Sequence, residues 1–324
     1  MTLVADLLTA ARERRANLTR ALLVEGTDCF RLFHGAVEGR PGLTVDRYGA
    51  TVLVQTFREP LADDELAAIR ELHALPVFYN HRGPEPRFDP SPAAQVEGTG
   101  LEVGLKYALR PRHRGKDPWL FLDFRAGRRW VKDNAGGARV LNLFAYTCGI
   151  GIAAAAGGAA EVWNVDFAGS ALSVGQRSAA LNGIDEEVFK TLRADVIPTM
   201  RQLAGLPIKG RGRRRQYMKF EPRQFDLIVL DPPTWAKSPF GAVDPVRDYS
   251  SLLKPCVLAC EPGGRILATN HVSTVNLEPW LETLRRSVSK SGRALEALEV
   301  ILPETDFPSP DNNPPMKMAV LTIR

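Results

Sequence analysis

The sequence predicts an α/β protein in two parts, a small α/β domain followed by a larger domain built on a doubly wound, mostly parallel sheet. Its 324 residues are about twice the usual domain length of roughly 150. From about residue 119, short apolar runs alternate with helical patterns, which is typical of parallel strands joined by crossover helices. The last two β-prone runs are joined by a proline-rich loop too short for a crossover helix, which indicates an antiparallel pair.

The first domain is expected over residues 1–115, as an N-terminal helix and a small α/β domain that binds the substrate. Its start, from Met1 to Arg20, has the spacing of an amphipathic helix and lacks the apolar core and cleavage site of a signal peptide. Glycines and prolines then divide residues 30–57 into short β-prone runs. A strand, a helix and a second strand are expected at Thr51–Phe57, Leu61–Leu75 and Val77–Asn80.

A basic, proline-containing loop, Leu109–Pro118, marks the expected boundary, and the second domain is expected over residues 118–324. Its expected strands are Ala138–Phe144, Glu161–Asp166, Phe189–Ala194, Phe225–Leu230, Arg265–Thr269, Leu295–Leu302 and Met316–Ile323. Its expected helices are Gly149–Ala160, Ala168–Leu181, Val196–Leu203, Tyr249–Ala259 and Leu277–Lys290.

The composition, with 44% hydrophobic and 24% charged residues, is that of a folded globular protein and excludes a disordered chain. No apolar run approaches the roughly 20 residues that a membrane helix needs. Four scattered cysteines are too few for a disulfide framework, which favours a reducing compartment and a cytoplasmic location. Cys256 and Cys260 could share a helix face, but no further ligand stands at zinc spacing, so core packing is favoured and no metal is expected.

Polar residues follow several predicted strands, at the edge where doubly wound sheets bind their ligands. The first strand leads into a tight turn, Asn142–Gly151, whose glycines let the backbone approach a ligand. Asp166 ends the second strand near the spacing at which an acidic side chain accepts hydrogen bonds from a ribose, and the alternative is that it caps the next helix. Asp195 ends the third strand and either accepts from an adenine amino group or caps its own helix.

The fourth predicted strand ends in Asp231-Pro232-Pro233-Thr234-Trp235. Two prolines fix φ and remove backbone donors, so the loop is stiff and its carbonyls stay available as acceptors. Trp235 offers a face on which a base can stack. This segment suits a planar base that presents N–H groups, and the alternative is a plain turn at the end of a strand.

Five segments of the chain resemble class I S-adenosylmethionine-dependent methyltransferases of the bacterial large-subunit ribosomal RNA type, a family that includes cytosine-C5 and guanine-N7 enzymes. The segments are Arg31–Gly49, Phe121–Arg129, Val140–Gly149, Asp226–Lys237 and Pro314–Leu321. The resemblance implies a Rossmann-like domain with a seven-stranded sheet whose last strand is antiparallel. Family members often carry an N-terminal PUA domain, and the residues before Arg31 are too few to supply one.

The resemblance implies S-adenosylmethionine as cofactor and assigns residues to it. The residues beside its methionine part would be Asn142, Phe144, Tyr146 and Thr147, with Asp166 at the ribose, Asp195 at the adenine and Asp231 on the methyl-transfer side. Asp123 and Arg125 would close the pocket, and the neighbouring Cys148, Gly149, Phe167 and Val196 complete the expected site. The chain departs from the family at Phe124, where a glutamine is usual, and at Cys148, where a glycine is usual.

The expected reaction is methylation of a nitrogen. A cytosine-C5 enzyme needs a cysteine thiolate to attack the ring, and in the family that cysteine follows the fifth strand. Here this position reads Ala268-Thr269-Asn270-His271-Val272-Ser273, with no cysteine. A nitrogen lone pair can attack the methyl group without a thiolate bonded to the ring. The expected catalytic residues are Asp231, Pro232, Asn270, which would orient the base, and His271, a proton acceptor or base contact whose alternative is a structural histidine.

The expected partner is RNA, most simply ribosomal RNA. The net charge is +5, and a basic insertion, residues 207–223, precedes the fourth strand with Tyr217 and Phe220 interleaved among its cations. The expected RNA-binding residues are Arg211, Arg213, Arg214, Arg215 and Trp235, and the alternative is that the insertion is a solvated loop. The sequence leaves a monomer and a homodimer equally open.

Other functions compete with this one. The substrate could be cytosine C5 through an unrecognised cysteine, or a molecule other than RNA. A nicotinamide-dependent oxidoreductase would share the Asp166 contact but has no use for the turn at Asp231. A noncatalytic RNA-binding module would explain the departures at Phe124 and Cys148.

Overall fold

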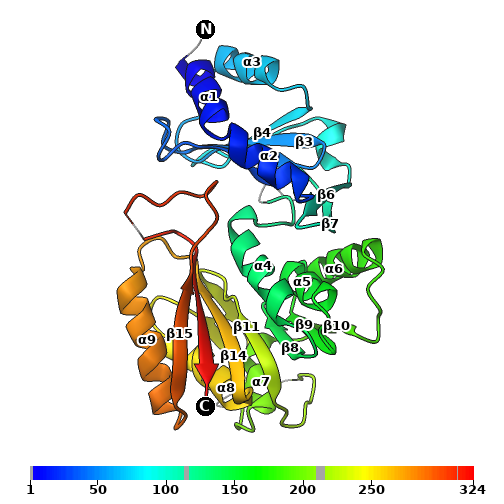
Figure 1. The fold of residues 1–324 in the computed structure, drawn as a ribbon, viewed down its shortest axis with the longest axis vertical. Coiled ribbons are helices and arrows are strands. Elements are labelled where there is room, and N and C mark those ends of the chain that lie inside the picture. Colours follow the sequence, from blue (N-terminus) through cyan, green and yellow to red (C-terminus); the bar gives the residue numbers. More distant parts are fainter. Residues whose placement is uncertain (1–2, 113–116, 209–215, 312) are drawn as a thin grey trace. The chain divides into compact units, whose positions relative to one another are not determined.

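The computed structural model describes residues 3–112, 117–208, 216–311 and 313–324, and it divides into two compact units (Figure 1). The first unit comprises the chain up to Arg125 together with Glu304–Pro310. The second comprises Ala126–Pro303 and Asp311–Arg324. None of the helices in the described ranges is long and apolar enough to span a bilayer.

The first unit is built on a five-stranded sheet in the order β1-β2-β3-β4-β5, in which β3 and β4 are parallel and the other pairs antiparallel. The strands are β1 (Cys29–His34), β2 (Leu43–Tyr48), β3 (Thr51–Thr56), β4 (Val77–His81) and β5 (Arg87–Phe88), and a separate hairpin joins β6 (Gly98–Glu102) to β7 (Leu105–Leu109). The helices are α1 (Leu3–Arg14), α2 (Ala16–Val24) and α3 (Asp63–Leu72), with short 3-10 turns at Pro92–Gln95 and Leu122–Phe124.

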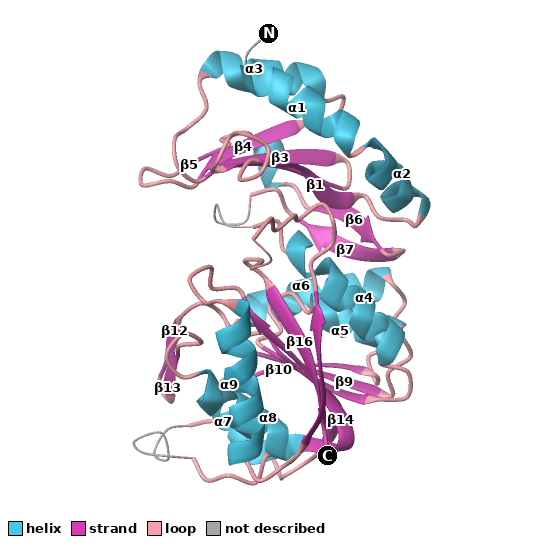
Figure 2. Ribbon diagram, turned by 60° about the vertical axis from the view of Figure 1, so that its left-hand side comes forward, coloured by secondary structure: helices cyan, strands magenta, loops and turns pink. Residues whose placement is uncertain are grey.

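Helices α1 and α3 lie on one face of this sheet (Figure 2). Their apolar residues, among them Leu8 and Ile69, pack against Phe33, Val45 and Val54 of the strands and form the core of the unit. The expected single helix over residues 1–20 is wrong, because two helices meet at Arg15. The buried Arg15 side chain forms a bidentate pair with Glu38, and the backbone leaves helical geometry at that residue.

The second unit is built on a seven-stranded sheet in the order β10-β9-β8-β11-β14-β16-β15. The strands are β8 (Arg139–Leu143), β9 (Glu161–Asp166), β10 (Phe189–Arg193), β11 (Phe225–Leu230), β14 (Cys260–Asn270), β15 (Leu295–Ile301) and β16 (Lys317–Ile323), and a small hairpin pairs β12 (Ala236–Ser238) with β13 (Gly241–Val243). The helices are α4 (Arg125–Asn134), α5 (Gly149–Ala156), α6 (Gly169–Leu181), α7 (Val196–Leu203), α8 (Tyr249–Ala259) and α9 (Leu277–Lys290).

The helices of this unit cover both faces of the sheet, with α4, α5 and α6 on one side and α7, α8 and α9 on the other (Figure 1). Strand β16 runs antiparallel to both β14 and β15. The predicted fold class is therefore confirmed, including the antiparallel last strand. Helix α7 has the predicted bounds because the Asp195 carboxylate caps its first turn. Helix α5 ends four residues earlier than expected, where Gly158 takes a positive φ of 84°.

Arg125 occupies the centre of a buried charge cluster in the first unit. It is fully buried, and its guanidinium donates to Asp306 at 2.5 Å, to Glu304 at 2.7 Å and to the carbonyl of Cys29 at 3.1 Å. The carboxylate of Asp306 also accepts from the backbone N–H of Arg31. Every nitrogen of the guanidinium is thus engaged, which offsets the cost of burying its charge.

Replacing Arg125 by methionine is expected to lower the free energy of unfolding by about 3–5 kcal/mol, because Asp306 then keeps a buried charge without its cation. Urea denaturation followed by circular dichroism measures the change. The control is Arg286→Ala, which breaks an exposed pair with Glu282 and should cost at most about 1 kcal/mol. Equal losses in the two variants would contradict the assignment.

Candidate functional site

The parallel register of the second unit aligns the ends of its central strands. Leu143 at the end of β8 pairs with Val165 of β9 and with Leu230 of β11, and Leu230 pairs with Ala268 of β14. The residues that follow these positions therefore gather at one edge of the sheet. This is the edge at which open α/β sheets bind their ligands.

The loop between β8 and α5 is strained. Phe144, Tyr146 and Cys148 have φ values of 58°, 47° and 60°, in the left-handed region that residues with a side chain seldom adopt. The backbone N–H of Tyr146 donates to Asp166 at 2.9 Å, which holds the loop in this shape. Strain of this kind concentrates at functional sites, and no sequence pattern predicts it here.

Asp166 organises this edge of the sheet from the end of β9. Its two carboxylate oxygens accept from the backbone N–H groups of Tyr146 and Ala168, at 2.9 and 2.8 Å. Burial raises the pKa of this carboxyl, although the backbone donors oppose the shift. The next residue, Phe167, is 64% exposed, so an aromatic ring stands open beside a buried acid.

Asn142 lies beneath the loop rather than at its surface. It is buried, and its amide donates to the Oδ1 atom of Asn164 at 2.9 Å, while Asn164 donates to the carbonyl of Lys190. Gly151 of α5 packs directly on Asn164, since a Cβ at this glycine would lie 1.9 Å from that Oδ1 atom. The two asparagines therefore form a polar contact inside the sheet that depends on the glycine.

Asp195 follows β10 and acts as a helix cap. Its Oδ1 atom accepts from the N–H of Ile197 at 3.0 Å, and its carbonyl accepts from the hydroxyl of Thr199. Val196 is buried behind it. The structure thus shows Asp195 as the cap of helix α7, and its contact with an adenine stays a prediction.

The turn after β11 places a carboxylate next to a histidine. Asp231 accepts a short hydrogen bond from the Thr269 hydroxyl, and its Oδ1 atom lies 3.8 Å from Nδ1 of His271. Pro232 is buried, whereas Trp235 at the far end of the turn is 62% exposed. The acid is therefore oriented from β14, and the indole is available for stacking.

The Asn270 side chain joins two loops, those that contain Pro245 and Val272, through hydrogen bonds. It is fully buried, its amide nitrogen donates to the carbonyl of Pro245, and its oxygen accepts from the N–H of Val272. The buried ammonium of Lys317 supports the same segment by donating to the carbonyl of Val272 at 3.1 Å. Sequence reasoning missed Lys317, which reaches this loop from the antiparallel strand β16. The expected role of Asn270 in orienting a base stays a prediction.

The remaining predicted residues lie elsewhere. Asp123 and Arg125 belong to the first unit. Arg211, Arg213, Arg214 and Arg215 lie outside the described residues. Two further residues of the basic insertion serve the fold of the second unit, because Arg223 pairs with Glu161 and Phe220 packs on Trp163.

All four cysteines are buried as free thiols. Burial raises the pKa of Cys260 to about 12 and raises that of Cys256, on the same side of the sheet, further still. The pKa values of Cys29 and Cys148 are also raised well above the ordinary range by burial. Near neutral pH each thiol therefore holds its proton.

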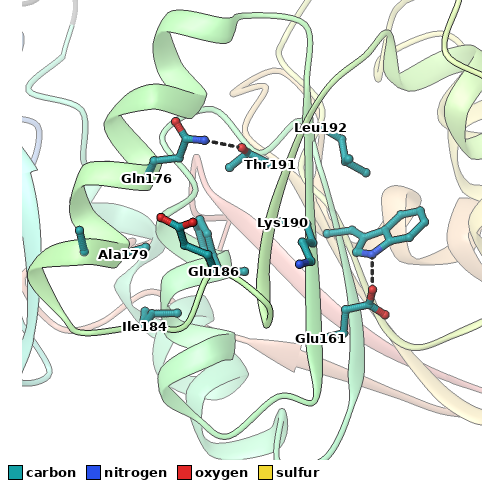
Figure 3. Close-up of a pocket in the computed structure, with 11 residues that line it drawn as sticks. Glu161, Gln176, Ala179, Ile184, Glu186, Lys190, Thr191 and Leu192 are labelled. Atoms are coloured by element: carbon teal, nitrogen blue, oxygen red, sulfur yellow. Dashed lines mark hydrogen bonds between the residues drawn. The ribbon is translucent and has the colours of Figure 1, made fainter.

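A cavity of about 600 Å³ lies around the edge strand β10 and not at the aligned strand ends (Figure 3). Glu161 and Lys190 lie on one side of the strand and Gln176 on the other, where it donates to the Thr191 hydroxyl. Among the predicted site residues that the structure describes, none lines this cavity. The strand ends, and not the cavity, bring the predicted residues together.

The fold and the strand ends define an enzyme class. A doubly wound sheet with a tight turn after its first strand and an acid at the end of its second is the arrangement that binds nucleotide-type cofactors. The family model of S-adenosylmethionine-dependent methyltransferases matches residues 30–322. The chain belongs to this family, is a methyltransferase and uses S-adenosylmethionine.

Relatives carry more specific descriptions. A ribosomal RNA large subunit methyltransferase of Deinococcus radiodurans is 32% identical over 309 residues, covering 88% of this chain and 70% of that protein. Ribosomal RNA large subunit methyltransferase I of Aeromonas hydrophila is 27% identical over 318 residues, covering 93% of this chain and 75% of its own.

Solved structures share the fold. A protein assigned as a methyltransferase and complexed with SAH has a TM-score of 0.79 at 22% identity, covering 98% of this chain and 81% of its own. A SAM-dependent methyltransferase from Agrobacterium tumefaciens has a TM-score of 0.64 at 18% identity, covering 87% and 88%.

Gly151→Ala is expected to lower the free energy of unfolding by about 1–3 kcal/mol, because the new methyl group must displace the buried Asn164 side chain and break its bond to Asn142. Chemical denaturation measures the loss. The matched control is Gly136→Ala, whose Cβ would meet its nearest neighbour at an ordinary 3.7 Å. Should the two variants be equally stable, the close packing of Gly151 on Asn164 would be refuted.

Proposed function

We propose that this chain transfers the methyl group of S-adenosylmethionine to a nitrogen of a base in large-subunit ribosomal RNA. The observation that carries the choice of nitrogen is the set of four buried cysteines, none of which is placed or ionised to act as a nucleophile. The names of the relatives from Deinococcus radiodurans and Aeromonas hydrophila support ribosomal RNA as the substrate.

The residues at the strand ends fit the cofactor. We assign the ribose hydroxyls to Asp166, whose carboxylate is fixed by backbone donors, and one face of the adenine to the exposed ring of Phe167. The carboxylate of Asp195 and the backbone of Val196 border the adenine edge. The strained loop holding Phe144, Tyr146, Thr147, Cys148 and Gly149 borders the methionine part. The predicted contacts of Asn142, Asp123 and Arg125 remain part of this proposal.

Nitrogen methylation mainly requires the protein to align the nucleophilic nitrogen with the methyl group of the cofactor. The bound sulfonium supplies an activated methyl group, and the nucleophilic nitrogen has to be held about 3–3.5 Å from it. A stiff turn is suited to this, because Pro232 and Pro233 have no N–H and leave carbonyl acceptors for the amino or imino groups of a base. The Thr269 hydroxyl fixes the orientation of Asp231.

His271 is placed to receive a proton if the methylated nitrogen loses one. Its Nδ1 atom lies 3.8 Å from Oδ1 of Asp231, and an imidazole is the side chain that most often serves as a general base. Trp235 provides a stacking surface for the same base or its neighbour. Asn270 and Lys317 act on the reaction by positioning the loop that carries His271.

Incubating the protein with methyl-deuterated S-adenosylmethionine and unmodified ribosomal RNA is expected to yield a deuterated methylguanosine or another N-methylated nucleoside on mass spectrometry. The Cys260→Ala variant should give the same product at a similar rate, because its thiol holds its proton near neutral pH. Deuterated 5-methylcytidine would overturn the nitrogen assignment. Cofactor binding without any labelled nucleoside would overturn the RNA assignment.

Cofactor affinity is expected to fall as the pH is lowered through the raised pKa of Asp166. Because burial raises that pKa above the ordinary value of about 4, the carboxyl takes up its proton at a higher pH and then accepts fewer bonds from the ribose. Calorimetric titration of S-adenosylmethionine across pH should show full affinity above the transition. Asp166→Asn should bind about tenfold or more weakly and lose the pH dependence.

The matched control for this titration is Asp185→Asn, a substitution in the exposed loop before β10. It should keep both the affinity and the pH profile of the unmodified protein. An Asp166→Asn variant that binds as tightly as Asp185→Asn would remove Asp166 from the cofactor site.

A further inference from the structure

A second site lies in the first unit, where β3 and β4 end. These two strands are parallel, they are joined by α3, and Thr56 and His81 are partners in their register. A cavity of about 400 Å³ opens beyond these residues. Its place corresponds to that of a ligand site, since ligands bind beyond the carboxyl ends of parallel strands.

A chain of hydrogen bonds fixes the imidazole of His81 in this cavity. The N–H of Leu61 donates to the Tyr79 hydroxyl, which lies 2.8 Å from Oγ1 of Thr56, and that atom lies 2.8 Å from Nδ1 of His81. These bonds fix the orientation of the imidazole, with Nδ1 at the Thr56 hydroxyl.

The other ring nitrogen of His81, Nε2, has no hydrogen-bond partner in the described part of the chain. The residue as a whole is 4% exposed, and the bond to Thr56 is made at Nδ1. Gly83 packs against the ring, since a Cβ there would lie 2.5 Å from Nε2. A ring nitrogen of a residue that lines a cavity and that has no protein partner is available to a polar atom of a ligand.

An aromatic ring forms part of the wall of the cavity, and a guanidinium packs on that ring. Phe57 lines it and is 43% exposed. The guanidinium of Arg82 lies over this ring, 5.2 Å from its centroid, and donates to Gln55. Stacking on an aromatic ring that is braced by a guanidinium is a common way in which proteins bind unpaired bases.

The charges around the cavity favour a nucleotide over a simple anion. Arg58 and Arg87 line it, but so do Glu59 and Glu85, and Arg87 lies 3.7 Å from Glu85. Two carboxylates would repel a free phosphate. A nucleotide within a strand brings both a phosphate for an arginine and amino groups for a carboxylate.

We propose that this cavity holds one unpaired nucleotide of the RNA substrate, with its base on Phe57, a polar atom of the base at Nε2 of His81 and its phosphate at Arg58. The inference rests on the proposed function, because RNA is the substrate assigned there. In this proposal the function of the first unit is to bind a single-stranded part of the RNA.

The test is the affinity of the full chain for a short fluorescein-labelled single-stranded RNA of mixed sequence, measured by anisotropy at a series of salt concentrations. Phe57→Ala should weaken binding about tenfold or more, whereas Phe57→Tyr, which keeps the ring, should bind like the unmodified protein. Arg58→Gln should lower the slope of log affinity against log salt by about one. Unlabelled single strands should compete better than a duplex of the same length.

Two further readouts separate this inference from the proposed function. S-adenosylmethionine binding should be unchanged in all three variants, and an unchanged circular dichroism spectrum should show that their first unit is folded. If the unmodified protein binds RNA and methylates ribosomal RNA while Phe57→Ala binds equally well, the nucleotide site is refuted and the proposed function stands. If the unmodified protein neither binds the strand nor methylates ribosomal RNA, the nucleotide site and the proposed function are both refuted.

Discussion

The parallel pairing of β9, β8, β11 and β14 is the constraint on which the candidate active site depends. These strands are central in the sheet, so their backbone groups are paired on both sides and their register cannot slip without moving apolar residues out of the core. Once the register is set, the positions after Leu143, Asp166, Leu230 and Asn270 must meet at one edge. The polar side chains found there are close because the backbone is paired, and not because they attract one another.

The same constraint forces strain on the loop that follows β8. The chain must leave the sheet and begin α5 within a few residues, and three residues with positive φ accomplish the turn, at a cost of roughly 1–3 kcal/mol each. Asp166 offsets part of that cost by accepting the N–H of Tyr146. An acid whose predicted function is to bind a ribose is therefore also the residue that keeps the loop in shape.

The polar residues of the site divide into two groups by what their side chains already do. Asn142 and Asn270 are buried and bonded within the protein, so they set positions. Phe167, Trp235 and the partly exposed His271 face outward and can meet a ligand. This division could not be read from the sequence, since all of these residues follow or end predicted strands.

The sequence predicted those features that are local. Helices α7, α8 and α9 have the predicted bounds because apolar periodicity determines them and, in α7 and α8, an aspartate cap marks the start. Prediction from the sequence failed for features that depend on contacts between residues far apart in the chain. Arg15, where the first helix breaks, pairs with Glu38. The turn of the β6–β7 hairpin donates from the Val103 N–H to the Thr27 hydroxyl, and Lys317 reaches its carbonyl partner across 45 positions.

The segment Glu304–Pro310 shows most clearly why such features escape sequence analysis. It lies between β15 and β16 of the second unit, yet it packs in the first. There it supplies the partners of Arg125, of the Arg31 N–H and of Arg15 from 181, 275 and 291 positions away.

Closing loops of this length costs entropy before any contact forms, and the pairing of β15 with β16 reduces that cost by bringing the two ends of the segment together. Glu304 and Asp306 therefore reach Arg125 from a segment whose two ends are held together by the pairing of these last two strands. It follows that a chain cut after Arg125 would keep the five strands of the first unit but leave its central guanidinium without either carboxylate.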